Sequence, residues 1–240
     1  MCPKLRWDGL PGLFLGFEAP GRWLPLLQGH ARLLLDAAPA VRVTSVPPDE
    51  WPARHYAEAL ELLRLVIQHR DGQPPASLID VGSGGGFPGM VVAAILPNTE
   101  VWLVEPLQKR ARLLEAMASQ LALTNVHVVA ERAETAGHTM LRETAEVVTA
   151  RAVAPLRELL EYTAPLAAMH GIVALPKGST LGTELGEAAA AMETVGVATA
   201  GDVAMRDSIS QTLRVAFFTK VSPSPPRYPR RPGMPAKRPL

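Results

Sequence analysis

The residues best suited to chemistry form one glycine-rich stretch, Asp80-Val81-Gly82-Ser83-Gly84-Gly85-Gly86-Phe87-Pro88-Gly89. An apolar run precedes it and a helical pattern follows it, so it occupies a strand-to-helix turn, where open parallel sheets bind ligands. Glycine permits positive φ and leaves no Cβ between the main chain and a ligand. A structural turn needs only one or two glycines, whereas four of the five residues from Gly82 to Gly86 are glycine. The stretch therefore predicts a site for a cofactor that contains a nucleoside.

The spacing of the glycines narrows the choice of cofactor. A dinucleotide fingerprint requires glycine at the sixth position, where this chain has Phe87, and a phosphate-binding loop requires Gly-Lys-Ser/Thr, which is missing here. The pattern Asp-x-Gly-x-Gly-x-Gly instead resembles motif I of class I methyltransferases, and the resemblance implies S-adenosylmethionine. Glu105, 23 residues after Gly82, is placed to accept hydrogen bonds from ribose hydroxyls. A dinucleotide enzyme would use such a carboxylate similarly, so a nicotinamide-dependent oxidoreductase remains an alternative.

Short apolar runs alternate with helical periodicities around this turn. They predict strands over residues 77–81, 100–104, 126–129, 147–151 and 171–175, and helices over residues 23–37, 52–69, 87–95, 107–121, 156–166 and 181–195. Two late strands, roughly 196–203 and 212–221, are joined by a short polar connection, which indicates antiparallel pairing. We therefore expect an α/β fold with a mostly parallel seven-stranded sheet, an antiparallel last strand and helices on both faces.

Three segments differ in composition. Residues 1–75 are predicted to form a helical N-terminal cap, residues 76–221 a cofactor-binding domain, and residues 222–240 a basic, proline-rich tail. The first 22 residues show no clean periodicity, and the sequence leaves open whether they are ordered or partly disordered. A single cysteine, Cys2, excludes an internal disulfide, and no residue cluster suggests a metal. No apolar run is long enough to span a membrane and no signal peptide is recognisable, so we expect a cytoplasmic protein.

The net charge of +1 is unevenly distributed. Residues 1–219 carry 18 basic and 23 acidic side chains, whereas residues 220–240 carry six basic side chains and no acidic one. A proline-rich basic segment is expected to be extended, so Arg227, Arg230 and Arg231 could reach RNA phosphates while Tyr228 stacks on a base. The alternative is a solubilising tail. Lys177, after the fifth predicted strand, is as consistent with helix capping as with RNA contact.

Several segments beyond the glycine-rich stretch carry a more specific resemblance. In chain order they are LIDVGSGGGFPGMVVAAILP, the turn Glu105-Pro106-Leu107-Gln108-Lys109-Arg110, LTNVHVVAERAE, TARAVAPL, ALPKG and RYPRRPGMPAKRPL. Over residues 30–240 the chain resembles the bacterial 16S ribosomal RNA (guanine-N7)-methyltransferases, also called the glucose-inhibited division protein B family. The resemblance implies the class I, Rossmann-like methyltransferase fold, S-adenosylmethionine as cofactor, and 16S ribosomal RNA or the small ribosomal subunit as partner.

The resemblance also implies roles for individual residues. It assigns cofactor contact in the first turn to Gly82 and Phe87, ribose and adenine contact to Glu105, Pro106 and Leu107, the adenine side to Ala133 and Glu134, and a further cofactor contact to Arg151. A buried structural salt bridge is the alternative for this arginine.

Some positions depart from the family pattern. Its usual Val-Asn-Leu-Thr is Val41-Arg42-Val43-Thr44 here, and its usual Arg-His-Phe-x-Asp-Ser-Leu is Arg54-His55-Tyr56-Ala57-Glu58-Ala59-Leu60. The ribose-contacting residue is more often Asp than Glu. The changes around residues 41–44 and 54–60 cluster in the segment that we expect to meet RNA, so they bear on the substrate more than on the cofactor. His55 alone is more typical of a helix-surface or capping histidine than of a catalytic one.

The chemistry of guanine N7 bears on which catalytic groups to expect. The nitrogen carries an in-plane lone pair and no proton, so its methylation needs no general base, and positioning can supply roughly 7–11 kcal/mol in favourable cases. The sequence contains no convincing pair of nucleophile and base, and we assign no catalytic acid or base. A noncatalytic RNA-binding or assembly protein with a methyltransferase fold is the second alternative.

Overall fold

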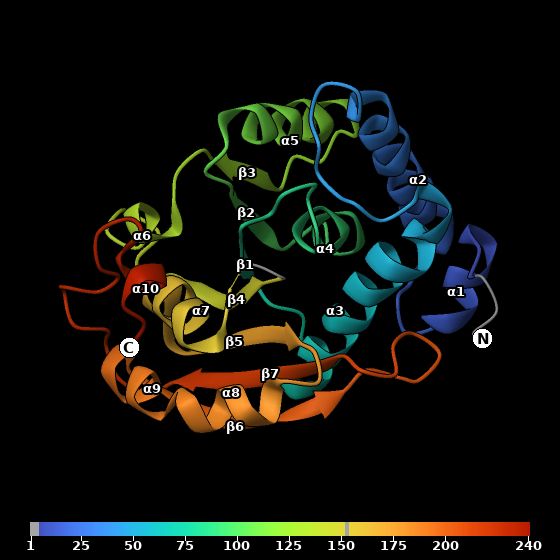
Figure 1. Cartoon of the computed structure of the whole chain (residues 1–240). Helices are drawn as coiled ribbons and strands as arrows, with labels where there is room; N and C mark the ends of the chain where they lie inside the picture. Colours follow the sequence, from blue (N-terminus) through green and yellow to red (C-terminus); the bar gives the residue numbers. More distant parts are fainter. Residues whose placement is uncertain (1–4, 152–153) are drawn as a thin grey trace.

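A seven-stranded sheet forms the centre of the computed structural model, which describes residues 5–151 and 154–240 (Figure 1). The strands follow the order β3-β2-β1-β4-β5-β7-β6. Their bounds are β1 Ser77–Val81, β2 Glu100–Val104, β3 Val126–Val129, β4 Ala145–Ala150, β5 Ala167–Lys177, β6 Val197–Ala204 and β7 Arg214–Lys220. Strands β1 to β5 pair in parallel, and β7 is antiparallel to both β5 and β6. The predicted sheet is confirmed, including the direction of its last strand.

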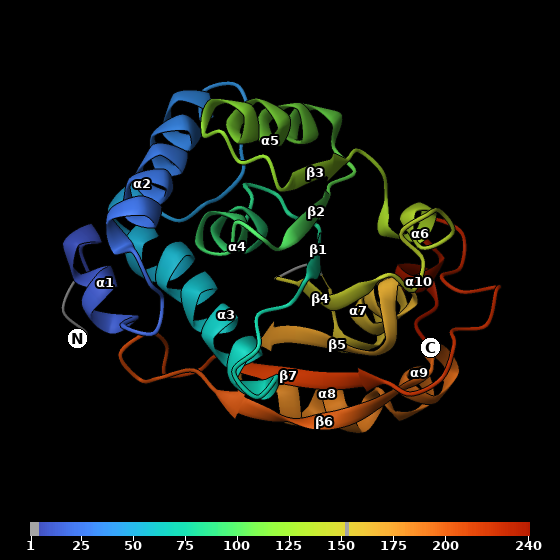
Figure 2. The same cartoon turned by 180° about the vertical axis from the view of Figure 1, so that it is seen from behind.

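Helices cover both faces of the sheet (Figures 1 and 2). Their bounds are α1 Leu10–Leu13, α2 Pro20–Ala37, α3 Glu58–His69, α4 Gly89–Ile95, α5 Gln108–Gln120, α6 Ala133–Ala136, α7 Leu156–Thr163, α8 Leu181–Glu187, α9 Ala189–Val195 and α10 Met234–Lys237. Alternate strand residues face opposite sides: Leu78 packs in the core that contains α2 to α5, and Ile79 in the core beneath α6 to α9.

The N-terminal region contributes helices and buried side chains to the core. From Leu5 onward the chain is described, a 3-10 turn at Trp7–Gly9 leads into α1, and Leu10 and Phe14 are buried in the core shared with α2 and α3. Residues 5–22, whose order the sequence leaves open, are therefore packed against the domain, while residues 1–4 lie outside the described residues. A segment of one helical turn is too short to show a period, although its apolar residues contribute to the core.

The C-terminal tail folds back onto the domain and does not extend away from it. It runs beside α6 and α7 and includes α10 (Figure 1). Arg142 donates to the carbonyl oxygens of Ser224 (2.6 Å) and Tyr228 (2.8 Å), and the Tyr228 side chain is buried. The expectation of a free arm with a stacking tyrosine is wrong, because side chains of the domain satisfy the backbone of the tail.

Some helix boundaries also differ from the prediction. Helix α4 begins at Gly89 and not at residue 87, the helix predicted over residues 156–166 ends in a 3-10 turn at Ala164–Leu166, and the one over 181–195 is divided at Ala188 into α8 and α9. Residues 52–57 form a π-helical turn that runs into α3. None of the helices within the described ranges is long and apolar enough to cross a membrane.

Candidate active site

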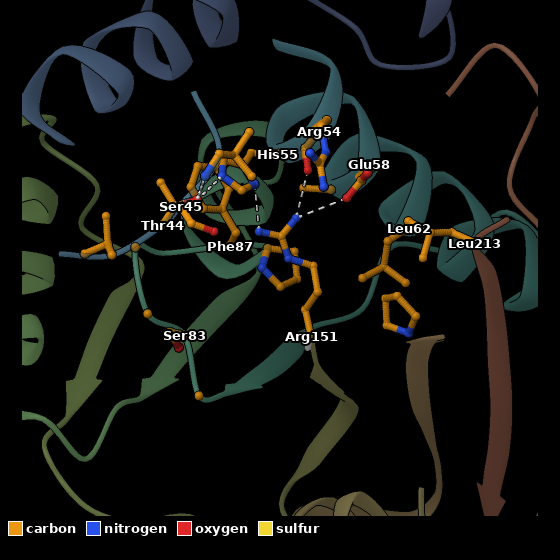
Figure 3. Close-up of a pocket in the computed structure, with 18 of the residues that line it drawn as sticks. Thr44, Ser45, Arg54, His55, Glu58, Leu62, Ser83, Phe87, Arg151 and Leu213 are labelled. Atoms are coloured by element: carbon orange, nitrogen blue, oxygen red, sulfur yellow. Dashed lines mark hydrogen bonds and ion pairs between the residues drawn. The ribbon is translucent and has the colours of Figure 1, made fainter. Parts of the chain in front are cut away.

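A cleft of about 1080 Å³ opens at the carboxyl edge of the parallel strands (Figure 3). It is lined by the glycine-rich turn after β1, the turn after β2, the end of β4, the chain before α3 and the end of β5. Single-ligand sites measure roughly 300–1,000 Å³, so the cleft has room for a cofactor and part of a substrate. Of the residues predicted from sequence, it brings together Gly82, Phe87, Glu105, Pro106, Leu107, Arg151 and Lys177.

The glycine-rich turn has the backbone geometry that its sequence predicts. Gly82, Gly84 and Gly86 have φ values of +73°, +56° and +92°, a region that favours glycine. A Cβ at Gly84 would meet only the carbonyl oxygen of Gly82, at 3.8 Å, so Gly84 faces open space. A Cβ at Gly86 would lie 2.4 Å from Met90 Cγ. The turn is thus packed from behind at Gly86 and accessible to a ligand at Gly84.

Glu105 joins this turn to the end of β2. Its buried carboxylate accepts hydrogen bonds from the backbone N–H of Gly84 (2.9 Å, Oε2) and of Leu107 (2.9 Å, Oε1). Two acceptor oxygens remain able to take further donors, since each carboxylate oxygen carries two lone pairs. The predicted ribose-binding carboxylate therefore lies beside the glycine turn, held in place by its neighbours.

Asp80, the acid of the glycine-rich motif, lies directly beneath the turn and was given no role by the sequence. Its Oδ2 accepts from the backbone N–H of Gly89 (3.0 Å), while Oδ1 has no partner among the described residues. Burial raises the pKa of Asp80 to about 7. An unpartnered buried carboxylate oxygen beside a ligand site marks a position for a cation or a hydrogen-bond donor.

The rear of the turn rests on two residues of the N-terminal cap. His30, on α2, is fully buried, and its Nε2 donates to the carbonyl oxygen of Gly85 (2.9 Å) because that oxygen can only accept. Its Nδ1 therefore accepts from the hydroxyl of Tyr56 (2.8 Å). Burial lowers the pKa of His30 to about 4, which keeps the ring neutral. The predicted helices give no sign of this pairing, because neither residue belongs to a recognisable motif.

Phe87 is enclosed by side chains from the same region. The His55 ring stacks on it at 4.7 Å, the Tyr56 ring meets it edge-on at 5.0 Å, and the Arg151 guanidinium lies 5.3 Å from its centre. Phe87 is itself buried. It forms an apolar wall between the glycine turn and the charged groups of the cleft.

Arg151 is the centre of a polar network in the cleft (Figure 3). Its Nη2 donates to Nδ1 of His55 (3.1 Å), and its Nη1 approaches the Arg54 carbonyl (3.3 Å) and the Glu58 carboxylate (3.4 Å). Burial raises the pKa of Glu58 to about 7 in spite of Arg151, and burial together with Arg151 lowers the pKa of His55 to about 4. The positive charge of Arg151 is thus only weakly compensated, because its carboxylate partner, Glu58, is distant and has a raised pKa.

Lys177 lines the cleft with its charge already paired. Its Nζ lies 2.6 Å from the Glu184 carboxylate and donates to the Ala154 carbonyl (3.2 Å). Glu184 also accepts from the backbone N–H of Leu156 (2.7 Å) at the start of α7. The observed contacts agree with the capping alternative, while RNA contact by Lys177 stays a prediction.

The remaining predicted site residues lie outside the lining of the cleft; they are Ala133, Glu134, Arg227, Arg230 and Arg231. Buried Glu134 accepts from the backbone N–H of Gly233 (2.9 Å) and thereby anchors the tail. Arg230 forms a two-pronged ion pair with Glu161. Arg227 and Arg231 are exposed. Glu134 and Arg230, which were expected to meet ligands, therefore form tertiary contacts instead, and their predicted ligand contacts remain without support.

The polar groups of the cleft fit an adenosyl amino acid. Gly84 leaves open space for it, the oxygens of Glu105 can accept from ribose hydroxyls, and Arg151 can donate to a carboxylate, while the buried Asp80 lies beneath the turn and outside the lining. No group of metal-ligating side chains occurs in the described part of the chain. Sheet order, glycine turn and strand-end carboxylate together define a class I, S-adenosylmethionine-dependent methyltransferase.

Comparison with known proteins identifies the family. Its profile, described as GidB, rRNA small subunit methyltransferase G, matches residues 23–208, and the chain belongs to this family. A Roseiflexus (strain RS-1) protein named ribosomal RNA small subunit methyltransferase G is 41% identical over 204 residues, covering 83% of this chain and 84% of the relative. A protein of the same name from Desulfitobacterium hafniense is 36% identical over 230 residues, covering 94% and 93%.

A solved structure shows the same fold at low sequence identity. A SAM-dependent methyltransferase from Aquifex aeolicus superimposes with a TM-score of 0.52 at 15% identity, covering 68% of this chain and 93% of that one. The resemblance inferred from the sequence motifs is confirmed for the family, the fold and the cofactor.

Proposed function

We propose that this protein transfers the methyl group of S-adenosylmethionine to N7 of a guanine in 16S ribosomal RNA. One observation carries the proposal: within a chain of this family, a single cleft joins the glycine turn, Glu105 and Arg151 and has room for a second ligand. The relatives' name, ribosomal RNA small subunit methyltransferase G, supports a substrate from the small subunit. Such a substrate in turn supports a cytoplasmic location.

Cofactor binding in this proposal falls to the strand ends. Gly82 and Gly84 admit the ligand, Glu105 accepts from the ribose, and the exposed Leu107 with Pro106 covers the adenine. S-adenosylmethionine supplies a methyl group activated by its positive sulfur. Residues 76–221 contain these groups, while residues 1–75 support the turn from behind and residues 222–240 cover α6 and α7.

The side chains of the cleft contribute positioning more than proton transfer. Guanine N7 has no proton to lose, so alignment of its lone pair with the methyl group accounts for catalysis. Phe87 forms an apolar wall that limits water, and Arg151 holds a positive charge at the rim of that wall. His55 stays neutral, because burial and Arg151 lower its pKa to about 4. It therefore orients neighbouring groups without carrying charge.

The side of the cleft proposed to meet RNA carries cations from the two segments that depart from the family pattern. Arg42 and Arg54 are exposed and line the cleft, and Arg110, also in its lining, donates to the carbonyl oxygen of Arg42 (2.9 Å). Exposed arginines that line the cleft suit phosphate contact. Because N7 lies in the deep, narrow major groove of A-form RNA, the target base is expected to be unpaired or splayed out.

The methyl transfer is tested on two substrates side by side. The protein is incubated with labelled S-adenosylmethionine and either unmodified small subunits or deproteinised 16S ribosomal RNA, and nucleosides are separated after digestion. We expect labelled 7-methylguanosine, and the absence of any labelled nucleoside on both substrates would overturn the proposal. The variant Gly84→Val is the matched control, because a branched side chain at φ +56° is strained and fills the open face of the turn.

A further inference from the structure

A relay of two hydrogen bonds runs from Arg151 through His55 to Thr44 along one wall of the cleft, and a third bond reaches Thr44 from the backbone (Figure 3). The Arg151 guanidinium, which can only donate, meets Nδ1 of His55 at 3.1 Å. Nε2 of the same ring lies 2.9 Å from Oγ1 of Thr44. The backbone N–H of Val46 donates to the same oxygen at 3.0 Å. All three side chains line the cleft.

The relay fixes the direction of the Thr44 hydroxyl. The Arg151 guanidinium can only donate, so we assign Nδ1 of His55 as the acceptor of that bond and place the proton of the neutral ring on Nε2, which then donates to Thr44. The burial that lowers the pKa of His55 to about 4 keeps the ring neutral at physiological pH. Thr44 Oγ1 then accepts two hydrogen bonds, one for each lone pair. Its O–H is left as a donor with no acceptor among residues 5–151 and 154–240.

The position of Thr44 brings this donor next to the cofactor turn. Its neighbour Val43 packs against Gly85, where an added Cβ would lie 3.3 Å from Val43 Cβ. Thr44 and the glycine turn thus share the cleft, which is larger than one small ligand requires. A base that enters the cleft shares it with the Thr44 hydroxyl. The group that approaches must carry an acceptor, since the hydroxyl can no longer accept.

We propose that the Thr44 hydroxyl donates a hydrogen bond to O6 of the target guanine and thereby selects guanine over adenine. This inference rests on the proposed function. Guanine presents two acceptors, N7 and O6, on the edge that must face the methyl group, whereas adenine presents N7 beside an amino donor. A hydroxyl that can only donate pairs with O6 but opposes the adenine amino group. Thr44 is thus a specificity-determining residue, with His55 and Arg151 as positioning residues behind it.

The experiment compares guanine with 2-aminopurine, which keeps N7 and lacks O6. Small subunits are reconstituted with either base at the methylated position, and kcat/KM is measured for wild type, Thr44→Val and Thr44→Ser. We expect kcat/KM of the wild type to be roughly tenfold higher on guanine than on 2-aminopurine because of this contact. In Thr44→Val, kcat/KM should fall about tenfold on guanine and stay unchanged on 2-aminopurine. Thr44→Ser, which keeps the hydroxyl, should restore the preference for guanine. Differences in the intrinsic reactivity of N7 cancel, because every enzyme is compared on the same two bases.

Binding of S-adenosylhomocysteine by calorimetry completes the test. Unchanged affinity in Thr44→Val shows that the variant is folded and that the hydroxyl is not needed for the cofactor, which supports contact with the base. Tenfold weaker binding would assign the hydroxyl to the cofactor and overturn the inference. A guanine preference in Thr44→Val equal to that of wild type would overturn it as well. Failure of the proposed function looks different: wild type would then methylate neither base, and the inference would fall with it.

Discussion

Two arginine–glutamate pairs, one in the cleft and one under the tail, have similarly exposed arginines but different geometry. The side chains of Arg151 and Arg230 are 19% and 23% exposed. Glu161 is fully buried and accepts from the Arg230 backbone N–H (2.8 Å), Nε (2.8 Å) and Nη2 (2.6 Å). Glu58 meets Arg151 only at 3.4 Å. We call the Arg230–Glu161 pair under the tail, with several short hydrogen bonds, the saturated pair. We call the Arg151–Glu58 pair in the cleft, with one long contact, the loose pair.

The pKa values reflect the same difference. Glu161 raises the pKa of Arg230, as a strong partner should, whereas burial lowers the pKa of Arg151 and raises that of Glu58 to about 7. A buried charge without full compensation is costly, so such groups are retained where function requires them. The comparison teaches that charge alone does not mark the site; incompletely satisfied charge does.

The largest expected effect comes from breaking the saturated pair. Arg230→Met leaves the Glu161 carboxylate buried without its guanidinium, which should lower the free energy of unfolding by about 3–5 kcal/mol. Its matched control is Arg227→Met, an exposed arginine of the same tail, for which we expect a change within about 0.5 kcal/mol. Urea denaturation measures both, and equal midpoints for the two variants would show that the pair is not structural.

Breaking the loose pair should affect the reaction and leave stability nearly unchanged. Arg151→Met removes a positive charge from the cleft, and we expect methyl transfer to fall about 100-fold, close to 2.7 kcal/mol in the barrier. The unfolding free energy should change by about 1 kcal/mol or less, because Glu58, with a pKa of about 7, can take up a proton. Single-turnover assays and urea denaturation separate the two effects. A large loss of stability with normal turnover would make Arg151 a structural arginine after all.

The glutamate of the loose pair should give a pH-dependent effect. Burial raises the pKa of Glu58 from 4.5 in the unfolded chain to about 7, so the folded state binds more protons between these values. Stability contributed by this group is therefore lost as pH rises from 4.5 to about 7. Relative to wild type, Glu58→Gln should gain about 2 kcal/mol over that window. Unfolding free energies at pH 5 and pH 8 measure the gain, and an equal difference between the two proteins at both pH values would contradict a pKa of about 7 for Glu58.

Local sequence explains much of the site, because local backbone rules produce it. Positive φ at Gly82, Gly84 and Gly86 needs glycine wherever the rest of the chain lies, and strand ends in a parallel sheet meet at one edge. The position of Glu105 follows from the same reasoning. These features could be read from spacing alone, and the observed cleft contains them.

Long-range partners could not be read in this way. The tail is basic and proline-rich, which favours an extended arm, yet Arg230 meets Glu161, 69 residues earlier, and Gly233 meets Glu134, 99 residues earlier. His30 lies on a mostly apolar helix and finds Tyr56 and Gly85 only after folding. Composition indicates how costly it is to remove a side chain from water. Whether that side chain is nevertheless buried depends on a specific partner that offsets the cost, and composition does not reveal the partner.

The smallest expected effect concerns the exposed arginines, and it tests whether RNA reaches the tail. Deleting the tail would also remove the contacts to Glu161 and Glu134, so point variants are the sharper probe. Arg227→Gln with Arg231→Gln should reduce the slope of log affinity against log salt by about 1–2, because each lost phosphate contact removes roughly 0.7–0.9. Arg42→Gln with Arg54→Gln, at the cleft, provides the comparison. A reduced slope for the cleft pair alone would confine RNA to the cleft. Equal reductions for both pairs would show that RNA also contacts the tail. In that case the Arg230–Glu161 pair holds the tail in place, and the exposed Arg227 and Arg231 bind RNA.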